Sequence, residues 1–118
     1  MPKENPIFDK RPWGNWEIID TGMGHQVKRI AVSSNKRLSL QSHKYRKEHL
    51  VFVSGKAEVE IDSKVTKLLI GDSIDIPLGA VHRLKNNKEI DLIVNEIKFW
   101  DYLGEDDIIR YEDDFGRV

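Results

Sequence analysis

Four residues in the middle of the chain have side chains that bind metal ions: Gln41, His43, Glu48 and His82. Residues two apart on a β-strand point to the same face, so Gln41 and His43 are expected to converge on one point. Two imidazoles, one carboxylate and one amide suit a divalent metal that keeps open positions. We therefore predict a metal site. Zinc is the first choice, with Mn, Co, Ni or Fe compatible; the alternative is that both histidines are ordinary half-buried side chains.

The segments that must position these residues have the pattern of short β-strands. In 56–62, the apolar residues Ala57, Val59 and Ile61 alternate with charged ones, which is the period of a half-buried strand. Similar runs recur along the chain between Gly, Pro and Asn turns, and no segment has the length of a helix for an α/β fold. We expect strands at 16–20, 25–32, 37–43, 48–54, 56–62, 65–70, 73–76, 81–84 and 91–99. This spacing predicts an all-β sandwich or barrel.

Length and composition limit the classes of protein to consider. The 118 residues are enough for one domain, spanning 1–118, with one core. We expect an extended arm at 1–12, where three prolines fall, and an acidic segment at 102–118 with one short helical turn around 105–110. A net charge of −1 argues against general binding to nucleic acid or anionic membranes, and the lack of cysteine excludes disulfides. No apolar stretch marks a signal peptide, so we expect a cytoplasmic protein.

The metal-binding residues stand in a spacing that resembles the two-part signature of the cupin superfamily. The first part corresponds to Asn35, Gln41, His43, Glu48 and Gly55, and the second to Gly71, Pro77, Gly79, His82 and Asn86. Asn35 stands where glycine is usual, and Asn tolerates a positive φ. Gln41 stands where the first histidine is usual. The resemblance implies a double-stranded β-helix, the jelly-roll barrel of cupins.

A closer resemblance, over nearly the whole chain, is to the type II phosphomannose isomerase domain, the C-terminal part of bifunctional mannose-1-phosphate guanylyltransferases. The matching segments are 11–14, 28–30, 38–43, 46–49, 76–83, 102–110 and 114–117. Departures from the usual residues are Tyr45, Leu50, Lys98–Trp100 and Phe115. The resemblance implies a metal-dependent isomerase that converts mannose 6-phosphate to fructose 6-phosphate through an enediolate. It does not include the nucleotidyltransferase half, so we do not expect guanylyl transfer by this chain.

This reaction needs a residue for proton transfer, and strand parity selects two candidates. Leu92, Val94, Glu96 and Lys98 share one face of the last long strand, with the first two expected in the core. Glu96 and Lys98 would then reach the mouth of the barrel. The alternative is a solvated ion pair at the end of a strand.

Four residues are candidates for binding the sugar phosphate. Arg37 and Ser39 share the parity of Gln41 and His43, which favours Arg37 over Arg83 as a phosphate ligand. Arg46 and Arg110 lie in segments that match the family, and a guanidinium fits phosphate well. A surface salt bridge is the alternative for each arginine.

Two other functions remain open, together with a question about assembly. One is a non-catalytic sugar-binding or regulatory cupin, and the other is an Fe(II) dioxygenase. By parity, Leu38, Leu40, Val51 and Val53 face away from the site. A second apolar face on barrel strands predicts packing on another subunit, so we expect a homodimer.

Overall fold

The computed structural model describes residues 7–100 and 107–118, which form strands and turns and contain no helix. In chain order the strands are β1 (Phe8–Arg11), β2 (Gly14–Gly22), β3 (His25–Val32), β4 (Leu40–Ser42), β5 (Arg46–Ser54), β6 (Ala57–Ile61), β7 (Lys64–Leu68), β8 (Ser73–Ile76), β9 (His82–Lys85), β10 (Leu92–Trp100) and β11 (Ile109–Glu112). The predicted all-β class is confirmed. None of the described residues belongs to a helix that could cross a membrane.

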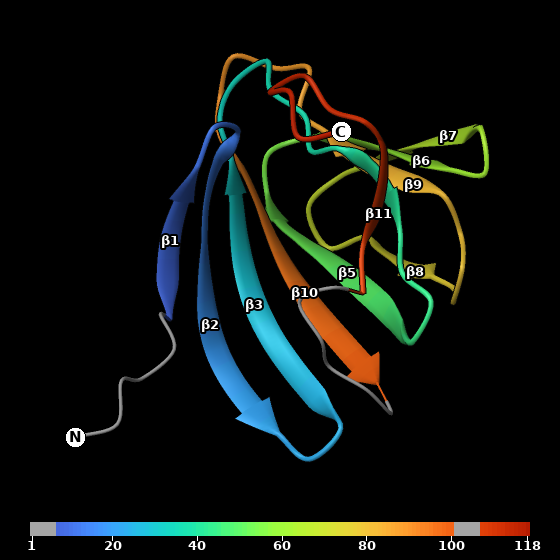
Figure 1. The fold of residues 1–118 in the computed structure, drawn as a ribbon. Coiled ribbons are helices and arrows are strands. Elements are labelled where there is room, and N and C mark those ends of the chain that lie inside the picture. The colour runs from blue at the N-terminus through green and yellow to red at the C-terminus, as the bar shows by residue number, and fades with distance from the viewer. Residues whose placement is uncertain (1–6, 101–106) are drawn as a thin grey trace.

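The strands form two antiparallel sheets (Figure 1). The larger sheet has the order β1-β2-β3-β10-β5-β8, and the smaller one β11-β4-β9-β6-β7. The core cluster takes Val32, Phe52 and Leu92 from the larger sheet and Val59 and Leu84 from the smaller one. The apolar core therefore lies between the two sheets.

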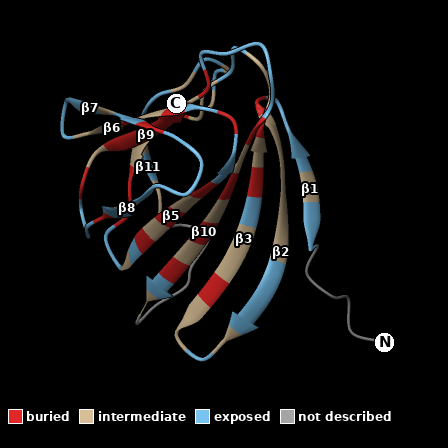
Figure 2. Cartoon of the chain, turned by 180° about the vertical axis from the view of Figure 1, so that it is seen from behind, coloured by how far each residue is buried: buried red, intermediate tan, exposed pale blue. Residues whose placement is uncertain are grey.

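The alternation along β10 explains how the fold makes both a core and a pocket. Leu92 and Val94 are fully buried, and they share their face of the strand with Glu96 and Lys98. Figure 2 shows this alternation as red bands along the central strands. The inward face of β10 is therefore apolar at one end of the barrel and charged at the other, where a pocket opens.

Two of the turns between strands depend on left-handed backbone conformations. Asn35 adopts φ 56°, in line with the expectation that Asn replaces a glycine there. Gly55 has φ 90°, and an added Cβ would lie 3.0 Å from the carbonyl oxygen of Asp91. A side chain at Gly55 is thus disfavoured both by backbone strain and by close contact with the backbone of Asp91.

Three expectations about the ends and the ligand strand are corrected. Within the predicted arm, residues 8–11 form β1, which pairs with β2; residues 1–6 lie outside the described residues. The predicted strand 37–43 is a regular strand only at 40–42, and Arg37 makes an isolated bridge to Lys85. The predicted helical turn around 105–110 is wrong for Ile109 and Arg110, which pair with β4 in a strand ladder; Glu105 and Asp106 lie outside the described residues.

Candidate metal and substrate site

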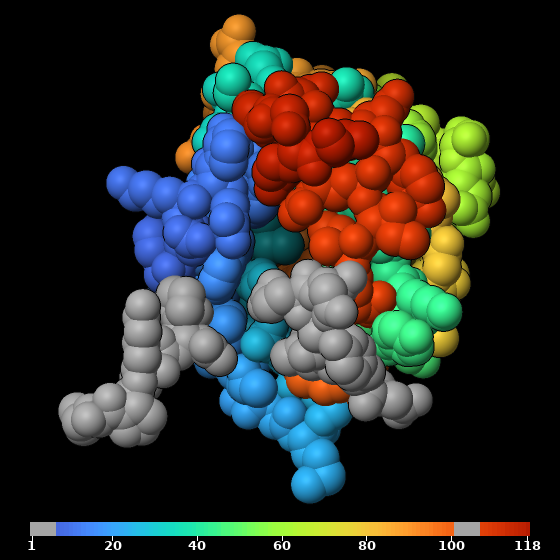
Figure 3. Space-filling model, viewed as in Figure 1, coloured from blue at the N-terminus to red at the C-terminus, as the bar shows by residue number. Residues whose placement is uncertain are grey.

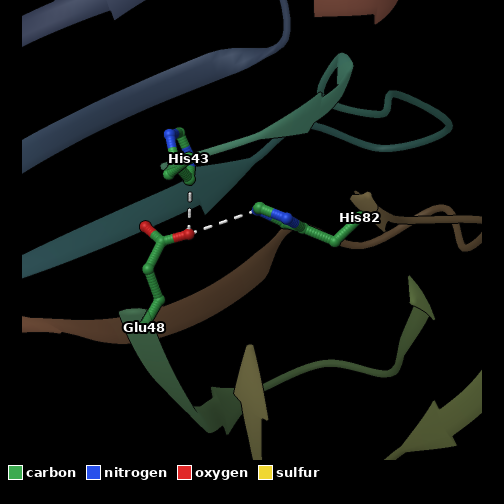
Figure 4. A group of neighbouring side chains, drawn as sticks. All are labelled: His43, Glu48 and His82. Carbon is green, nitrogen blue, oxygen red and sulfur yellow. Dashed lines mark ion pairs between the residues drawn. The ribbon is translucent and has the colours of Figure 1, made fainter. Parts of the chain in front are cut away.

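Three of the four predicted metal ligands meet at one buried point. His43 directly follows β4, Glu48 lies on β5, and His82 begins β9. One ligand atom from each residue lies within 4.8 Å of the others. Glu48 Oε1 is 3.5 Å from His43 Nε2 and 3.2 Å from His82 Nε2, as Figure 4 shows. Each of the three residues is at most 5% exposed.

Backbone contacts bring these distant segments together. The Pro77–Gly79 turn precedes β9, and the Gly79 amide donates a hydrogen bond of 2.9 Å to the carbonyl oxygen of His43. Gly79 adopts φ 76°, which glycine tolerates without strain. The backbone of Gln41 pairs with that of His82 between β4 and β9. The Pro-x-Gly turn therefore fixes the two histidines relative to each other.

Hydrogen bonds fix how the two imidazoles present their nitrogens. His43 Nδ1 lies 2.7 Å from the Asp107 carbonyl oxygen, and His82 Nδ1 lies 3.0 Å from the Ala80 carbonyl oxygen. A carbonyl oxygen only accepts, so each Nδ1 carries a hydrogen, and Nε2 is the nitrogen that each ring would offer to a metal in its neutral form. Both Nε2 atoms face Glu48. Two imidazole nitrogens and a carboxylate, each ring oriented by a backbone partner, are a donor set that fits a divalent metal.

The electrostatics of this cluster favour an ionised carboxylate between two imidazoles. Burial tends to raise the pKa of Glu48, but hydrogen bonds from His82 and Glu96 and the charges of the histidines bring it well below its usual range. Burial lowers the pKa of His43 to about 4. Burial also opposes charge on His82, but the contact with Glu48 raises its pKa above the usual value. A negative Glu48 beside a neutral His43 is the protonation state that metal binding requires.

Gln41 lines the same pocket as His43 and Glu48. Its backbone pairing with His82 places it next to the cluster. That its amide oxygen acts as a fourth ligand stays a prediction.

The two predicted proton-transfer residues lie in this pocket too. Glu96 and Lys98 are buried, line its wall, and form an ion pair of 3.5 Å between Lys98 Nζ and Glu96 Oε1. Burial first, and the negative charge of Glu48 second, raise the pKa of Glu96 to about 7. The pair is therefore enclosed beside the candidate metal ligands rather than solvated at a strand end.

The predicted substrate ligands divide into two groups. Ser39, Arg46 and Arg110 line the pocket, whereas Arg37 is not part of its wall. Arg37 instead donates two hydrogen bonds, of 2.7 and 2.9 Å, to the carboxylate of Asp114. The prediction that Arg37 points into the pocket is wrong, because it assumed a regular strand and the chain before Leu40 is not one. For the same reason Leu38, expected to face outward, contacts the core and lines the pocket.

Arg83 is buried and pairs with neighbouring segments of the chain, so its role is structural. It is 4% exposed, donates to the Leu38 carbonyl oxygen at 3.0 Å, and pairs with Glu112 at 3.2 Å. It ties β9 to β11 and does not belong to the wall of the pocket.

Sequence reasoning missed several residues of the pocket: Arg11, Trp16, Lys28 and Arg117. Lys28 could have been found, because it alternates with Ile30 and Val32, which are buried. Burial first, and the positive charge of Lys98 second, lower the pKa of Lys28 to about 7. Arg11 and Arg117 lie in the family-matching segments 11–14 and 114–117, but these segments are at opposite ends of the chain, and only the folded structure shows that both reach the pocket.

The fold and the His-Glu-His cluster define a cupin, and solved structures agree. The Schizosaccharomyces pombe Cnp3 cupin domain matches with a TM-score of 0.70 at 11% identity, covering 74% of this chain and 64% of that one. At this identity the likeness shows the fold alone. The predicted cupin fold is confirmed.

The family is shown by the sequence: residues 5–113 match the family model "Mannose-6-phosphate isomerase C-terminal", and the chain belongs to this family. The predicted resemblance is confirmed. Xanthan biosynthesis protein XanB of Xanthomonas campestris pv. campestris is 50% identical over 108 residues, which are 92% of this chain and 23% of that protein. Mannose-1-phosphate guanylyltransferase ManC of Salmonella typhimurium is 48% identical over 108 residues, 92% of this chain and 22% of that protein. The chain thus spans less than a quarter of these curated relatives.

Proposed function

We propose that this chain is a metal-dependent aldose–ketose isomerase that converts mannose 6-phosphate to fructose 6-phosphate. The observation that carries the proposal is a buried Glu96–Lys98 pair in the same pocket as His43 and Glu48, two members of the cluster that His82 completes. Membership of the family described as mannose-6-phosphate isomerase supports the choice of substrate.

The metal ligands are assigned to His43, Glu48 and His82, with Gln41 as the fourth. A divalent metal, zinc in our proposal, would act there as a Lewis acid that stabilises negative charge on the substrate oxygens. The net charge of such a set, one carboxylate with three neutral ligands, leaves the ion positive. The charge is the same as in the two-histidine, one-carboxylate iron centre of oxygenases, and the proposed site differs from such a centre in the additional amide oxygen of Gln41.

Proton transfer is assigned to Glu96. Its carboxylate takes the proton from C2 of the aldose; the C–H electrons form the C1–C2 double bond of an enediolate and the C1 carbonyl electrons move to O1. The proton then returns to C1, the hydroxyl proton of O2 passes to O1, and C2 becomes the carbonyl carbon of the ketose. Lys98 holds the Glu96 carboxylate in place through the 3.5 Å ion pair and lends positive charge to the developing enediolate. Ser39 and Arg46 line the same pocket and are assigned to the sugar.

Enclosure of the reacting groups supports this chemistry. Glu48, Glu96 and Lys98 are each less than 10% exposed. Charges in a pocket from which water is excluded interact more strongly than they do in solution.

The test is isomerisation of mannose 6-phosphate in D2O, with fructose 6-phosphate measured and deuterium located. An enediolate route predicts turnover with deuterium at the carbon that receives the proton. A chain that binds metal and sugar phosphate without turnover would favour the non-catalytic cupin function instead. Oxygen consumption with Fe(II) would indicate a dioxygenase.

We further infer that two copies of the chain associate through the outer face of the larger sheet. On this face Val53 and Phe99 are 45% and 41% exposed, and Val51 lies between Asn95 of β10 and Ser73 of β8. Asn95, on the same side of β10, has a buried Oδ1 with no hydrogen-bond partner among the described residues. A partner surface would cover the apolar side chains and supply a donor to Asn95.

A cytoplasmic location stays a prediction from composition.

A further inference from the structure

The pocket contains more positive than negative side chains. Its basic residues are Arg11, Lys28, Arg46, Lys98, Arg110 and Arg117. Its acidic residues are Glu48 and Glu96, and the first of these is committed to the histidines while the second pairs with Lys98. The pocket wall therefore suits an anionic ligand.

Three of these arginines lie at the end of the pocket away from the histidine cluster. In the larger sheet, β1 with Arg11 is four strands from β5 with Glu48. In the smaller sheet, Arg110 on β11 pairs with Gln41, which pairs in turn with His82, so two strand spacings, about 10 Å, separate Arg110 from His82. Both β1 and β11 are edge strands. Figure 3 shows a hollow between the blue N-terminal strands and the red C-terminal segment.

The Nε of Arg110 is a buried hydrogen-bond donor for which the described residues supply no acceptor. Burial first, and the positive charge of Arg117 second, lower the pKa of Arg110; Arg11 adds to this effect, against the opposite influence of Asp113. A buried donor without an acceptor is costly, and an anion bound there would remove the cost.

The other two arginines are held in place by carboxylates. Arg117 donates to Asp113 through Nε at 2.7 Å and through a second nitrogen at 3.1 Å. Arg11 lies 3.2 Å from Asp9 and 5.8 Å from the centre of the Trp16 ring. Their guanidinium groups are thus oriented before any ligand binds.

We propose that Arg11, Arg110 and Arg117 form a phosphate-binding subsite at the mouth of the pocket, which selects phosphorylated over neutral sugars. A guanidinium donates two parallel hydrogen bonds to phosphate oxygens, and three arginines match a dianion better than one. The proposal rests on the proposed function, which assigns the reacting carbons to the histidine end. The phosphate end of the sugar then faces the arginines, and Arg37 is not assigned to it because Arg37 does not line the pocket.

The test compares three ligands: mannose 6-phosphate, unphosphorylated mannose and inorganic phosphate, titrated calorimetrically into the zinc-loaded chain. The variants are Arg110→Gln and Arg110→Lys. The matched control is Arg29→Gln, which removes an exposed arginine that pairs with Glu17 on the outer face. We expect Arg110→Gln to weaken binding of both phosphate compounds by roughly tenfold to a hundredfold, the range for loss of a charged hydrogen bond, and to leave mannose binding unchanged. Arg110→Lys should lose less, and Arg29→Gln nothing.

Three results would contradict the proposed subsite. The first is an equal loss of affinity for mannose and mannose 6-phosphate in Arg110→Gln, and the second is no loss of affinity in that variant. The third is that the unmodified chain binds no phosphate compound. The folding of the Arg110 variants is checked by thermal unfolding: their melting temperatures should equal that of the Arg29→Gln control. Phosphate binding that depends on Arg110, with no isomerase turnover, would contradict the proposed reaction and leave the subsite standing.

Discussion

At the scale of single residues, two carboxylates in one pocket have different roles because their neighbours differ. Glu48 lies between two imidazole nitrogens, which keep its pKa low. Glu96 faces that negative charge from within a buried wall, which brings its own pKa to about 7. The arrangement assigns metal binding to the first and proton transfer to the second.

The role of Glu96 is tested by Glu96→Gln, which keeps shape and removes the proton acceptor. We expect kcat to fall by roughly a hundredfold to ten-thousandfold, the usual contribution of a general base, while the bound metal per chain stays unchanged. The measurements are a coupled assay for fructose 6-phosphate and metal analysis of the purified variant. Glu17→Gln, on an exposed carboxylate that pairs with Arg29, is the matched control. A Glu96→Gln enzyme as fast as the control would exclude Glu96 as the base.

At the scale of elements, Asp107, which precedes β11, holds the loop that carries His43 in shape. The Asp107 carboxylate accepts the Lys44 and Tyr45 amides at 2.8 and 3.0 Å, and its carbonyl oxygen accepts the His43 ring N–H. A residue 64 positions along the chain thus orients His43.

Loss of the Asp107 carboxylate should therefore weaken metal binding without removing a ligand. For Asp107→Ala we expect metal affinity to fall by about tenfold to a hundredfold, as for other residues that orient a ligand, and stability to fall by roughly 1–3 kcal/mol. Asp107→Asn keeps one acceptor and should lose less. Calorimetric zinc titration and chemical unfolding measure the two effects, with Asp75→Ala, whose side chain is 83% exposed, as the control. Unchanged zinc affinity in Asp107→Ala would show that the loop holds His43 by itself.

The same C-terminal segment contains an ion pair, between Asp113 and Arg117, whose contribution to stability depends on pH. Hydrogen bonds from Arg117 hold the pKa of Asp113 at about 2, below its ordinary value of 3.8. A lowered acid pKa contributes stability that is complete above 3.8 and is lost as the pH falls from 3.8 through 2. The difference in melting temperature between the unmodified chain and Asp113→Asn should thus be constant near neutral pH and shrink towards pH 2. A difference that grows on acidification would contradict this assignment.

Sequence patterns located the residues fixed by local signals and missed those fixed by long-range pairing. His43, Glu48 and His82 were found because their spacing within turns and strands is local. Arg11 and Arg117 lie in the matching segments 11–14 and 114–117 but were not selected, because nothing in those segments predicts that the folded chain brings both to one pocket. Arg37 was assigned to the pocket on the assumption of a regular strand, whereas Asp114, 77 positions away, holds it elsewhere.

At the scale of the whole molecule, the inner and outer faces of the barrel differ in character. The inward face is apolar at one end and charged at the other, and the outer face of the larger sheet carries exposed apolar side chains. The second face is the basis of the proposed homodimer.

Association should respond to charge on that outer face. We expect the unmodified chain to sediment as a dimer and Val53→Lys to sediment as a monomer, because a buried ammonium without a partner opposes association. Val65→Lys, on β7 of the other sheet where Val65 is 53% exposed, should stay dimeric. Equal sedimentation of both variants and the unmodified chain would remove the outer face as the interface.

The most direct test of the central claim is an isomerase assay on metal-stripped protein with Zn, Mn, Co, Ni and Fe added back singly. We predict that fructose 6-phosphate forms from mannose 6-phosphate only after a metal is restored, and that His82→Ala loses both the bound metal and the turnover. Turnover by the stripped protein at the same rate as with metal, or an active His82→Ala variant, would contradict the claim that this cluster is a metal site at the centre of catalysis.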